Sequence, residues 1–558
     1  LTLNFFQLPC SKRKPMDEYQ PHGTSRKKKD DSKMWCSQNL LTSSSGRVFY
    51  RSRKHYTKMI TRNVGKNYAN IPGPKGPLRL GNIFKNVLGD YRWTELHKAG
   101  FDKYKKYGSI VKETMVPGTD IVWLYDPNDI AIVLNDSSTK EFPQRRSHLA
   151  LAKYRRDRPH VYRSTGLLPT NGPEWWRLRS ELQKEMSSPM KVRSFLPDVD
   201  SITNELVQLL DTSVIVDMLP ELHRLNLELT CLLVFDERMD SFSEFERHPN
   251  SRTSRLIKSA EETNSCILPT DQGFQLWRYF ETPTYRKLRK AQEYMENVAV
   301  ELVSQKISFF KEDSDAVYKS NMSRSSLLEE YLKNPNLDLC DIVGMAADLV
   351  LAGIDTTSYS TSFAVYHLAR NREVQEKLYQ ESLAIFPNRD SPITEDALKS
   401  KIPYARAVMK EVFRMNPVSV GVGRILNNKL ILGGYNIPKG VSPQNKKSLN
   451  FVVTQNMVAC RLEKNFENPE AFNPERWLNR KNPVNPYLVL PFGHGMRACI
   501  ARRLAEQNIL VFLLRVYFYI FGFKSLLIFP HFSVCSKLSN QVDGHCSYGC
   551  RNTANQQT

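Results

Sequence analysis

Residues 491–503 of this 558-residue chain, PFGHGMRACIARR, combine a cysteine with side chains that can shape and protect its sulfur. Phe492, Gly495, Arg497 and Cys499 form the pattern FxxGxRxC. Glycine permits a tight turn, a phenylalanine ring can shield a sulfur a few residues further on, and an arginine can pair with a carboxylate. Cys499 stands just before a predicted helix, where free backbone N–H groups and the helix dipole stabilise a thiolate. The spacing therefore favours an activated thiolate over an ordinary buried thiol.

The elements that must position this loop are mainly helices. Apolar residues recur at helical spacing around 202–210, 222–233, 291–310, 342–368 and 405–415. Strand-like runs are shorter and fewer: IVKETMV, DIVWLY and ILNNKLILGGYNIP. IPGPKGP, residues 71–77, is a rigid hinge that separates an N-terminal tail from the rest. We expect a mainly α fold with a small β region, in a single large domain over residues 71–558.

Composition narrows the class of protein. Hydrophobic residues make up 41% of the chain and aromatic residues 10%, which excludes a wholly disordered or collagen-like protein. The ten cysteines contain no CxxC pair, which argues against a zinc ribbon or a thioredoxin-type redox site. We therefore expect a globular protein whose chemistry depends on one cysteine loop.

Positive charge is concentrated near the N-terminus. The net charge is +21, and residues 1–70 carry 15 Lys or Arg against four Asp or Glu. The remaining chain is only mildly basic, so we expect no nucleic-acid partner. Residues 34–70 are rich in basic residues, Ser and Thr and lack acidic ones, which predicts a mitochondrial presequence, with a basic tail as the alternative. Residues 1–33 are an uncertain extension, possible upstream read-through before Met34.

The FxxGxRxC loop resembles the haem-binding loop of the cytochromes P450, the haem-thiolate monooxygenases. The resemblance runs from about residue 71 to 508, and further motifs follow in the family's order. It implies the cytochrome P450 fold, haem b as the cofactor, and Cys499 as the iron ligand within a haem-thiolate loop at 491–501. It also implies hydroxylation of an organic substrate with dioxygen and two electrons.

The segment ADLVLAGIDTTSY, residues 347–359, resembles the family's AGxDTT helix at the distal face of the haem. This match implies that Asp355 and Thr356 are an acid–alcohol pair that delivers protons to reduced dioxygen without filling the pocket with water. Ala352 and Gly353 would leave room for dioxygen and substrate. Without the resemblance, a Thr pair after a Gly is a common irregularity of helices.

Two further sets of residues are implied by the resemblance. Glu411 and Arg414 in KEVFR, with Arg476 in FNPERW, match a buried structural charge network that is stable only when complete. The groups that bind the haem propionates match three arginines and one indole N–H: Arg497 of the cysteine loop, Arg179 and Trp175 in GPEWWRLRS, and Arg424 in GRIL. Taken alone, each of these side chains would be read as an ordinary surface group.

Four basic residues resemble the positions at which mitochondrial members bind an acidic 2Fe–2S ferredoxin, which is reduced by its own reductase. They are Arg406, Lys410, Arg502 and Arg503. The alternative is a solvated basic face. With the presequence, this resemblance implies a peripheral protein on the matrix side of the inner mitochondrial membrane.

Several longer segments, among them GLLPTNGPEWWRLRS and VVTQNMVACRLE, resemble the insect mitochondrial ecdysteroid 22-hydroxylases. This implies hydroxylation of an ecdysteroid precursor, a sterol, at side-chain carbon 22 in moulting-hormone biosynthesis. Alternatives are another sterol position or lipophilic compound, an isomerase or peroxygenase on the same fold, a haem-dependent sensor, or an inactive haem-binding product of a faulty gene model.

Three features depart from the family's pattern. Ala501 stands where members usually have Gly, and Ala is small enough to keep the following helix close to the haem. Residues 442–451, SPQNKKSLNF, are a polar insertion between segments that are otherwise adjacent. Residues 509–558 are an atypical C-terminus in which the family's last hairpin is not recognisable.

Overall fold

The computed structural model describes residues 65–75, 82, 91, 95–116, 118–136, 142–212, 217–312, 325–440, 449–478 and 483–523. The chain divides into two compact units, Leu1–Lys66 and Asn67–Thr558, and all of the architecture below belongs to the second. Residues 1–33 and almost all of the predicted presequence at 34–70 lie outside the described residues. So do residue 441, residues 442–448 of the predicted insertion and residues 524–558 of the atypical C-terminus.

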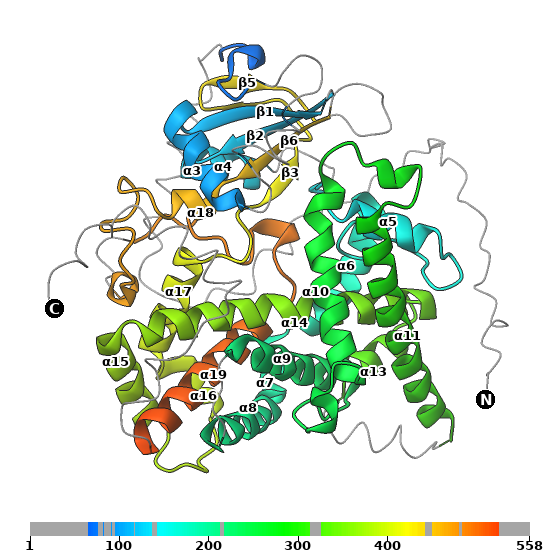
Figure 1. The fold of residues 1–558 in the computed structure, drawn as a ribbon, viewed down its shortest axis with the longest axis vertical. Helices are drawn as coiled ribbons and strands as arrows, with labels where there is room; N and C mark the ends of the chain where they lie inside the picture. The colour runs from blue at the N-terminus through cyan, green and yellow to red at the C-terminus, as the bar shows by residue number, and fades with distance from the viewer. Residues whose placement is uncertain are drawn as a thin grey trace, which may run out of the picture. The chain divides into compact units, whose positions relative to one another are not determined.

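Most described residues of the second unit are helical, with one small sheet region, which confirms the predicted fold class (Figure 1). The longer helices are α3 (Leu96–Tyr107), α6 (Gly172–Met186), α8 (Leu196–Thr212), α9 (Met218–Phe235), α10 (Arg252–Asp271), α11 (Pro283–Glu312), α14 (Leu339–Ala369), α15 (Arg372–Leu383), α17 (Pro403–Met415) and α19 (Arg502–Phe523). Shorter ones are α4 (Pro127–Leu134), α5 (Leu149–Arg156), α7 (Pro189–Ser194), α13 (Leu327–Leu332), α16 (Glu395–Ser400) and α18 (Asn456–Ala459).

Helix α14 is the central helix, and α9, α10, α11, α17 and α19 all pack against it (Figure 1). It begins with a capping box, because Asp338 accepts a hydrogen bond from the Asp341 backbone N–H while the Asp341 side chain accepts one from the Asp338 N–H. Gly353 lets α9 approach closely, since a Cβ atom there would lie 2.5 Å from Thr230 Oγ1. The α14 segment predicted to carry chemistry is therefore held between neighbouring helices.

The sheet region lies beside the helices and has four strands in the order β1-β2-β6-β3 (Figure 1). Strands β1 (Ile110–Val116) and β2 (Thr119–Leu124) form an antiparallel hairpin. Strand β6 (Leu449–Thr454) pairs in parallel with β2 and antiparallel with β3 (Gly423–Ile425). Strands β4 (Leu430–Leu432) and β5 (Tyr435–Ile437) form a separate pair. Leu449–Phe451, the end of the predicted insertion, therefore belong to the sheet.

Helix α19 runs from the cysteine loop into the helical core. Val511, Leu513 and Tyr517 are fully buried, so residues 509–523 of the segment predicted to be atypical are a core helix. Its one internal cation, Arg515, is also buried and forms an ion pair with Asp200 at 2.6 Å. No described helix is long and apolar enough to cross a bilayer.

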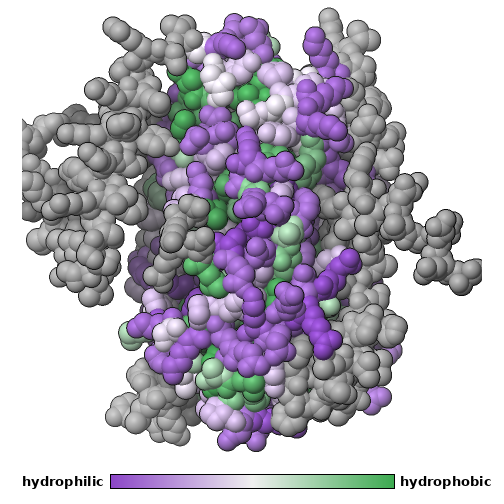
Figure 2. All heavy atoms as spheres, turned by 90° about the vertical axis from the view of Figure 1, so that its left-hand side faces the viewer, coloured by the Kyte–Doolittle hydropathy of each residue, from purple (hydrophilic) through white to green (hydrophobic). Residues whose placement is uncertain are grey.

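Hydrophilic residues cover most of the described surface on the side that carries α15, with apolar residues only in small groups (Figure 2). The apolar residues of the helices gather instead in one core that joins α6, α8, α9, α14, α17 and α19. Two smaller clusters pack the faces of the sheet region. The helical core and the sheet together provide the walls of the cavity described next.

Candidate active site

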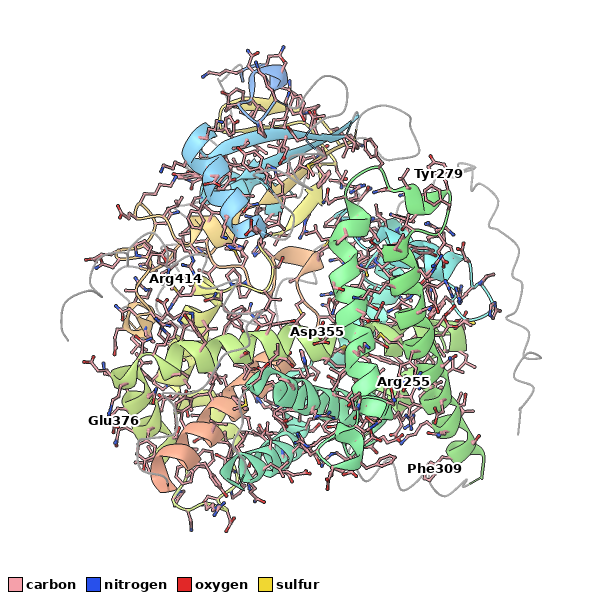
Figure 3. The ribbon with its side chains drawn as sticks, in the orientation of Figure 1. Arg255, Tyr279, Phe309, Asp355, Glu376 and Arg414 are labelled. Atoms are coloured by element: carbon pink, nitrogen blue, oxygen red, sulfur yellow. The ribbon has the colours of Figure 1, made fainter. Side chains whose placement is uncertain are left out.

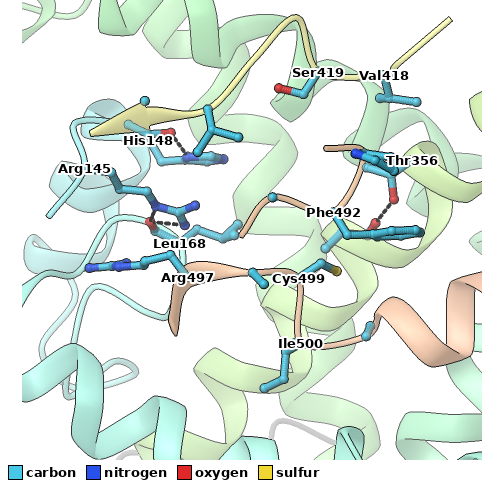
Figure 4. Close-up of a pocket in the computed structure, with 18 of the residues that line it drawn as sticks. Arg145, His148, Leu168, Thr356, Val418, Ser419, Phe492, Arg497, Cys499 and Ile500 are labelled. Atoms are coloured by element: carbon cyan, nitrogen blue, oxygen red, sulfur yellow. Dashed lines mark hydrogen bonds between the residues drawn. The ribbon is translucent and has the colours of Figure 1, made fainter. Parts of the chain in front are cut away.

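A cavity of about 630 Å³ lies where α14, α6, β3 and the cysteine loop meet (Figure 4). Cys499, Phe492 and Arg497 of the loop line it, together with Thr356 of α14. Much of the remaining wall is apolar: Leu182, Met186, Leu233, Ile267, Met345 and Phe451. A pocket of this kind suits a hydrophobic ligand that meets a few polar groups.

The cysteine loop is closed by its own backbone. The Cys499 N–H donates to the Phe492 carbonyl at 2.8 Å, and the Ala498 N–H donates to the Gly495 carbonyl at 3.0 Å. Gly493 and Gly495 have φ values of +69° and +72°, which L side chains rarely adopt. The glycine of the motif is thus required by the turn, as the sequence predicted.

The surroundings of Cys499 shift the pKa of its thiol in opposite directions. Burial raises the thiol pKa above its ordinary value, while the backbone N–H of Ala501 and the charges of Arg179 and Arg502 lower it. The N–H of Ala501 is available with Ala as it would be with Gly, so the departure from the family's pattern keeps this donor. A metal cation bound at the sulfur would add the remaining stabilisation of the thiolate.

The described residues bind the Arg497 guanidinium group but leave one of its nitrogens without a hydrogen bond. Its Nε donates to the Pro143 carbonyl at 2.9 Å, and its Nη2 donates to the Thr170 carbonyl and to Asn171 Oδ1. The guanidinium lies 3.8 Å from the ring centre of Trp175. Its Nη1 is buried and has no hydrogen-bond partner among the described residues. This orphaned donor calls for an acceptor that the protein does not supply.

Helix α6 carries two of the predicted cofactor residues on one face. Trp175, Leu178, Arg179 and Leu182 are all buried, at the i, i+3, i+4 and i+7 spacing of a helix face. Arg179 Nη2 donates to the Ala498 carbonyl at 2.8 Å, so the helix and the cysteine loop are joined directly. The predicted WxxxR pair therefore reaches the cavity wall.

Five arginines line the cavity, Arg146 and four whose guanidinium groups lie near the cysteine loop or one another: Arg145, Arg179, Arg424 and Arg497. None of the four forms an ion pair within the described part of the chain. Burial, together with the charges of the neighbouring arginines, lowers the pKa of Arg497 to about 8 and that of Arg424 to about 10. Such a cluster is suited to a ligand that brings carboxylates, as haem propionates do.

Arg145 and His148 were missed by sequence reasoning. Arg145 Nε and Nη2 donate to the Leu168 carbonyl at 2.9 and 2.5 Å, which places the guanidinium near Arg497 (Figure 4). Burial and nearby arginine charges lower the pKa of His148 to about 3, so its imidazole is neutral. Both precede α5 in the segment FPQRRSH, which carries no spacing that marks a binding site.

The predicted acid–alcohol pair lies on two sides of α14. Thr356 lines the cavity, and its Oγ1 donates to the Ala352 carbonyl at 2.7 Å. Asp355 is 5% exposed and does not line the cavity. Its Oδ2 accepts from Asn264 Nδ2 at 2.7 Å. Burial raises the pKa of Asp355 to about 6, aided by Glu261 and opposed by Asn264.

The three residues of the predicted charge network come together. Glu411 accepts hydrogen bonds from Arg414 Nε and Nη2 at 2.9 and 2.8 Å and from Arg476 Nε at 3.0 Å. Glu411 and Arg414 are fully buried. Phe413, on the same helix, meets Phe492 edge to face at 5.3 Å between ring centres, so the network lies directly behind the cysteine loop.

The four basic residues predicted to bind a ferredoxin differ in exposure. Lys410, Arg502 and Arg503 are exposed, on α17 and at the start of α19, two helices in contact. Arg502 forms an ion pair with Glu506 at 2.9 Å, and Arg503 donates to the Ser187 carbonyl. Arg406 is half-buried and donates to the Leu398 carbonyl. Three of the four thus present charge to solvent.

Comparisons with known proteins agree with this geometry. The sequence profile of the family described as Cytochrome P450 matches residues 72–517. Cytochrome P450 302a1, mitochondrial, of Drosophila melanogaster is 56% identical over 456 residues, which cover 81% of this chain and 88% of the relative. Ecdysone 20-monooxygenase of the same species is 29% identical over 460 residues, covering 80% and 82%. Probable cytochrome P450 CYP44 of Caenorhabditis elegans is 30% identical over 465 residues, covering 81% and 88%.

The chain therefore belongs to the cytochrome P450 family. It is a monooxygenase, and its cofactor is a thiolate-ligated haem, as predicted. The cavity fits this group, because a cysteine sulfur and an arginine with an unused buried donor face the same space. The family match also extends to residue 517, beyond the predicted limit of the resemblance at 508.

Proposed function

We propose that this monooxygenase hydroxylates a steroid, an ecdysteroid precursor at side-chain carbon 22. The observation that carries the proposal is the 56% identity with a mitochondrial P450 over four-fifths of the chain. A second insect relative is named for its action on ecdysone. The apolar wall beside Cys499 and Thr356 supports a hydrophobic substrate of this class.

Within this function, Cys499 is the haem ligand, since its sulfur shares the cavity with the arginines that would bind the haem propionates. Haem so bound supplies the activation of dioxygen. Arg179, Arg424 and Arg497 bind its carboxylates, with Trp175 supporting the guanidinium of Arg497. Arg145 joins this set, because its guanidinium faces the same cavity. Gly495 and Phe492 set the turn and cover the sulfur.

Thr356 and Asp355 manage protons. The Thr356 hydroxyl lines the cavity, and its hydrogen bond to the Ala352 carbonyl can be exchanged for one to a ligand there. Asp355, whose pKa of about 6 keeps part of it protonated near neutral pH, is the adjacent store of protons. Ala352 and Gly353 have little or no side chain, so they leave room in the cavity beside Thr356.

Electrons come from a 2Fe–2S ferredoxin that docks on the face formed by Lys410, Arg502 and Arg503. Exposed charges on two contacting helices suit a brief, electrostatically guided encounter. Arg406 contributes charge from a half-buried position.

The protein acts in mitochondria, at the matrix side of the inner membrane. Between α10 and α11 four large apolar or aromatic residues are strongly exposed: Phe274, Leu276, Tyr279 and Phe280. Tyr279 projects from this segment in Figure 3. Such a patch suits shallow contact with a lipid surface.

The test is reconstitution of residues 34–558 with haem, a 2Fe–2S ferredoxin and its reductase, supplied with ecdysteroid precursors. Mass spectrometry and NMR of the product should locate the new hydroxyl at carbon 22. A hydroxyl at another carbon would refute the position, and turnover of non-steroid lipids alone would refute the substrate class. The Cys499→Ala variant should lose the thiolate-type spectrum of the reduced, carbon-monoxide-bound protein.

A further inference from the structure

Three titratable side chains outside the cavity form a row that ends at Asp355. His223 of α9 lies between Asp355 of α14 and Glu261 of α10. The distance from His223 Nε2 to Asp355 Oδ1 is 3.6 Å, and that from His223 Nδ1 to Glu261 Oε1 is 3.4 Å. Figure 3 shows Asp355 where α14 passes beside α10. The two nitrogens of one imidazole thus face two different carboxylates.

The inner contact of this row is unsatisfied. His223 Nε2 and Asp355 Oδ1 are buried, and neither has a hydrogen-bond partner among the described residues. They face each other at a distance slightly too long for a hydrogen bond. Asn264 holds the other oxygen of Asp355, which leaves Oδ1 directed at the imidazole. Two buried orphaned atoms that face each other mark a contact that a small movement would complete.

The three side chains of this row also differ in their exposure to solvent. The side chains of His223 and Asp355 are 3% and 7% exposed, whereas that of Glu261 is 40% exposed. The other groups that face the imidazole and the carboxylate are the edge-on ring of Tyr359 from α14 and the amide of Asn264 from α10. Glu261 is therefore the titratable side chain of this row that reaches solvent.

We infer that Glu261 and His223 form a path that carries protons from solvent to Asp355. The path rests on the proposed role of Asp355 as the proton store for the reaction. Glu261 gives a proton to His223 Nδ1, and the N–H bond at Nε2 breaks as an O–H bond forms at Asp355 Oδ1. One proton enters and one leaves the imidazole, no electrons are exchanged, and reorientation of the ring restores its starting tautomer.

The pKa shifts of His223 and Asp355 support proton transfer toward Asp355. Burial lowers the pKa of His223 to about 4, so the imidazole is neutral and able to accept a proton at neutral pH. Burial and Glu261 raise the pKa of Asp355 to about 6, so this carboxylate takes up a proton more readily than an exposed one. A neutral imidazole between two carboxylates is suited to relay protons.

The experiment compares His223→Gln and Glu261→Gln with a matched control, Glu262→Gln, in the haem-loaded full chain. Glu262 is the next residue on α10 and contacts Lys287 instead, at 4.0 Å. In both path variants, turnover with ferredoxin and reductase should fall about tenfold, and the solvent deuterium isotope effect should rise. The control should match the wild type.

A second readout does not depend on turnover. Infrared spectroscopy of the resting holoenzyme can follow the carboxylic acid band of Asp355, identified by its loss in Asp355→Asn. In Glu261→Gln the titration midpoint of this band should move to lower pH, because a negative charge that raises the pKa is gone. It should stay in place in Glu262→Gln.

Wild-type turnover, isotope effect and infrared midpoint in both path variants would overturn the inference. If Asp355→Asn itself kept full turnover, the proposed proton store would be refuted, and the path with it. A loss in Asp355→Asn alone would instead refute only the path. Should His223→Gln fail to bind haem, Glu261→Gln decides, because its side chain is partly exposed and its replacement leaves the buried imidazole in place.

Discussion

The buried carboxylate of Glu411 is the clearest place to test how the cysteine loop is supported. Glu411→Gln removes one charge without changing the size of the side chain. In the wild type, this carboxylate accepts from Arg414, Arg476, the Trp477 indole N–H at 2.8 Å and the Asn473 backbone N–H at 2.9 Å. Replacement by an amide turns one acceptor into a donor that faces other donors and leaves two arginines without their counter-charge.

The expected loss in the free energy of unfolding follows from the burial of Glu411 and Arg414. Breaking a buried ion pair by removing one partner costs about 3–5 kcal/mol, against a total stability of about 5–15 kcal/mol for a folded domain. Glu411 and Arg414 are both fully buried, so this range applies without a discount for solvent. The matched control is Glu475→Gln. Its partner Lys377 is 55% exposed, and such a surface pair contributes about 0–1 kcal/mol.

Urea unfolding of the haem-loaded protein, followed by far-UV circular dichroism, measures the free energy of unfolding of the wild type and of both variants. The pH dependence provides a further check. Burial raises the pKa of Glu411, but the hydrogen bonds and charge of Arg414 outweigh it and hold that pKa below its ordinary value. Because the folded-state pKa is depressed, the charge stabilises the fold above the ordinary glutamate value of about 4.3 and loses this effect as the pH falls through the folded pKa. The gap between wild type and variant should therefore narrow in acid.

An equal loss in Glu411→Gln and Glu475→Gln, or a loss below about 1 kcal/mol in both, would refute the argument that burial makes the network strong. A gap that stays constant into acid would show that the amide acts through its shape instead of its charge.

Three other changes test the site. Thr356→Ala should raise the hydrogen peroxide released per product about tenfold, because the cavity loses the hydroxyl proposed to deliver protons; unchanged coupling would remove Thr356 from proton delivery. Lys410→Glu should slow ferredoxin-driven turnover more at low salt than at high salt, and a loss that ignores salt would point to altered folding instead. Arg497→Leu should speed transfer of haem to an acceptor protein about tenfold, because a hydrogen bond to a charged group contributes about 1.5–3 kcal/mol; transfer at the wild-type rate would mean that Arg497 does not hold the propionates.

The FxxGxRxC loop was predictable because its structure is local. Its turn depends on glycine at a positive φ, and its closing hydrogen bond joins Cys499 to Phe492, seven positions away. Strand β1 and helix α17 were predictable for a related reason. Their apolar spacing already shows which side chains share a buried face.

Strand β6 shows where local pattern stops being sufficient. Leu449–Phe451 follow a polar run and were assigned to an insertion, yet all three pair with β2, and Phe451 also pairs with β3. Those partners lie about 330 and 30 positions away in the chain. A strand of this kind is decided by the partners available to it, and the sequence of the strand alone does not contain them.

The sequence by itself determined the cysteine loop with its glycine turn, since these follow from residue types at short spacing. Through the resemblance of its motifs to those of the cytochromes P450 it also implied the family and the cofactor. Only the tertiary structure decided that Arg145 joins the cavity, that Arg406 is half-buried, and that Asp355 faces away from Thr356 toward His223. The physical reason is that the direction of a side chain and the field around it depend on elements packed from distant parts of the chain.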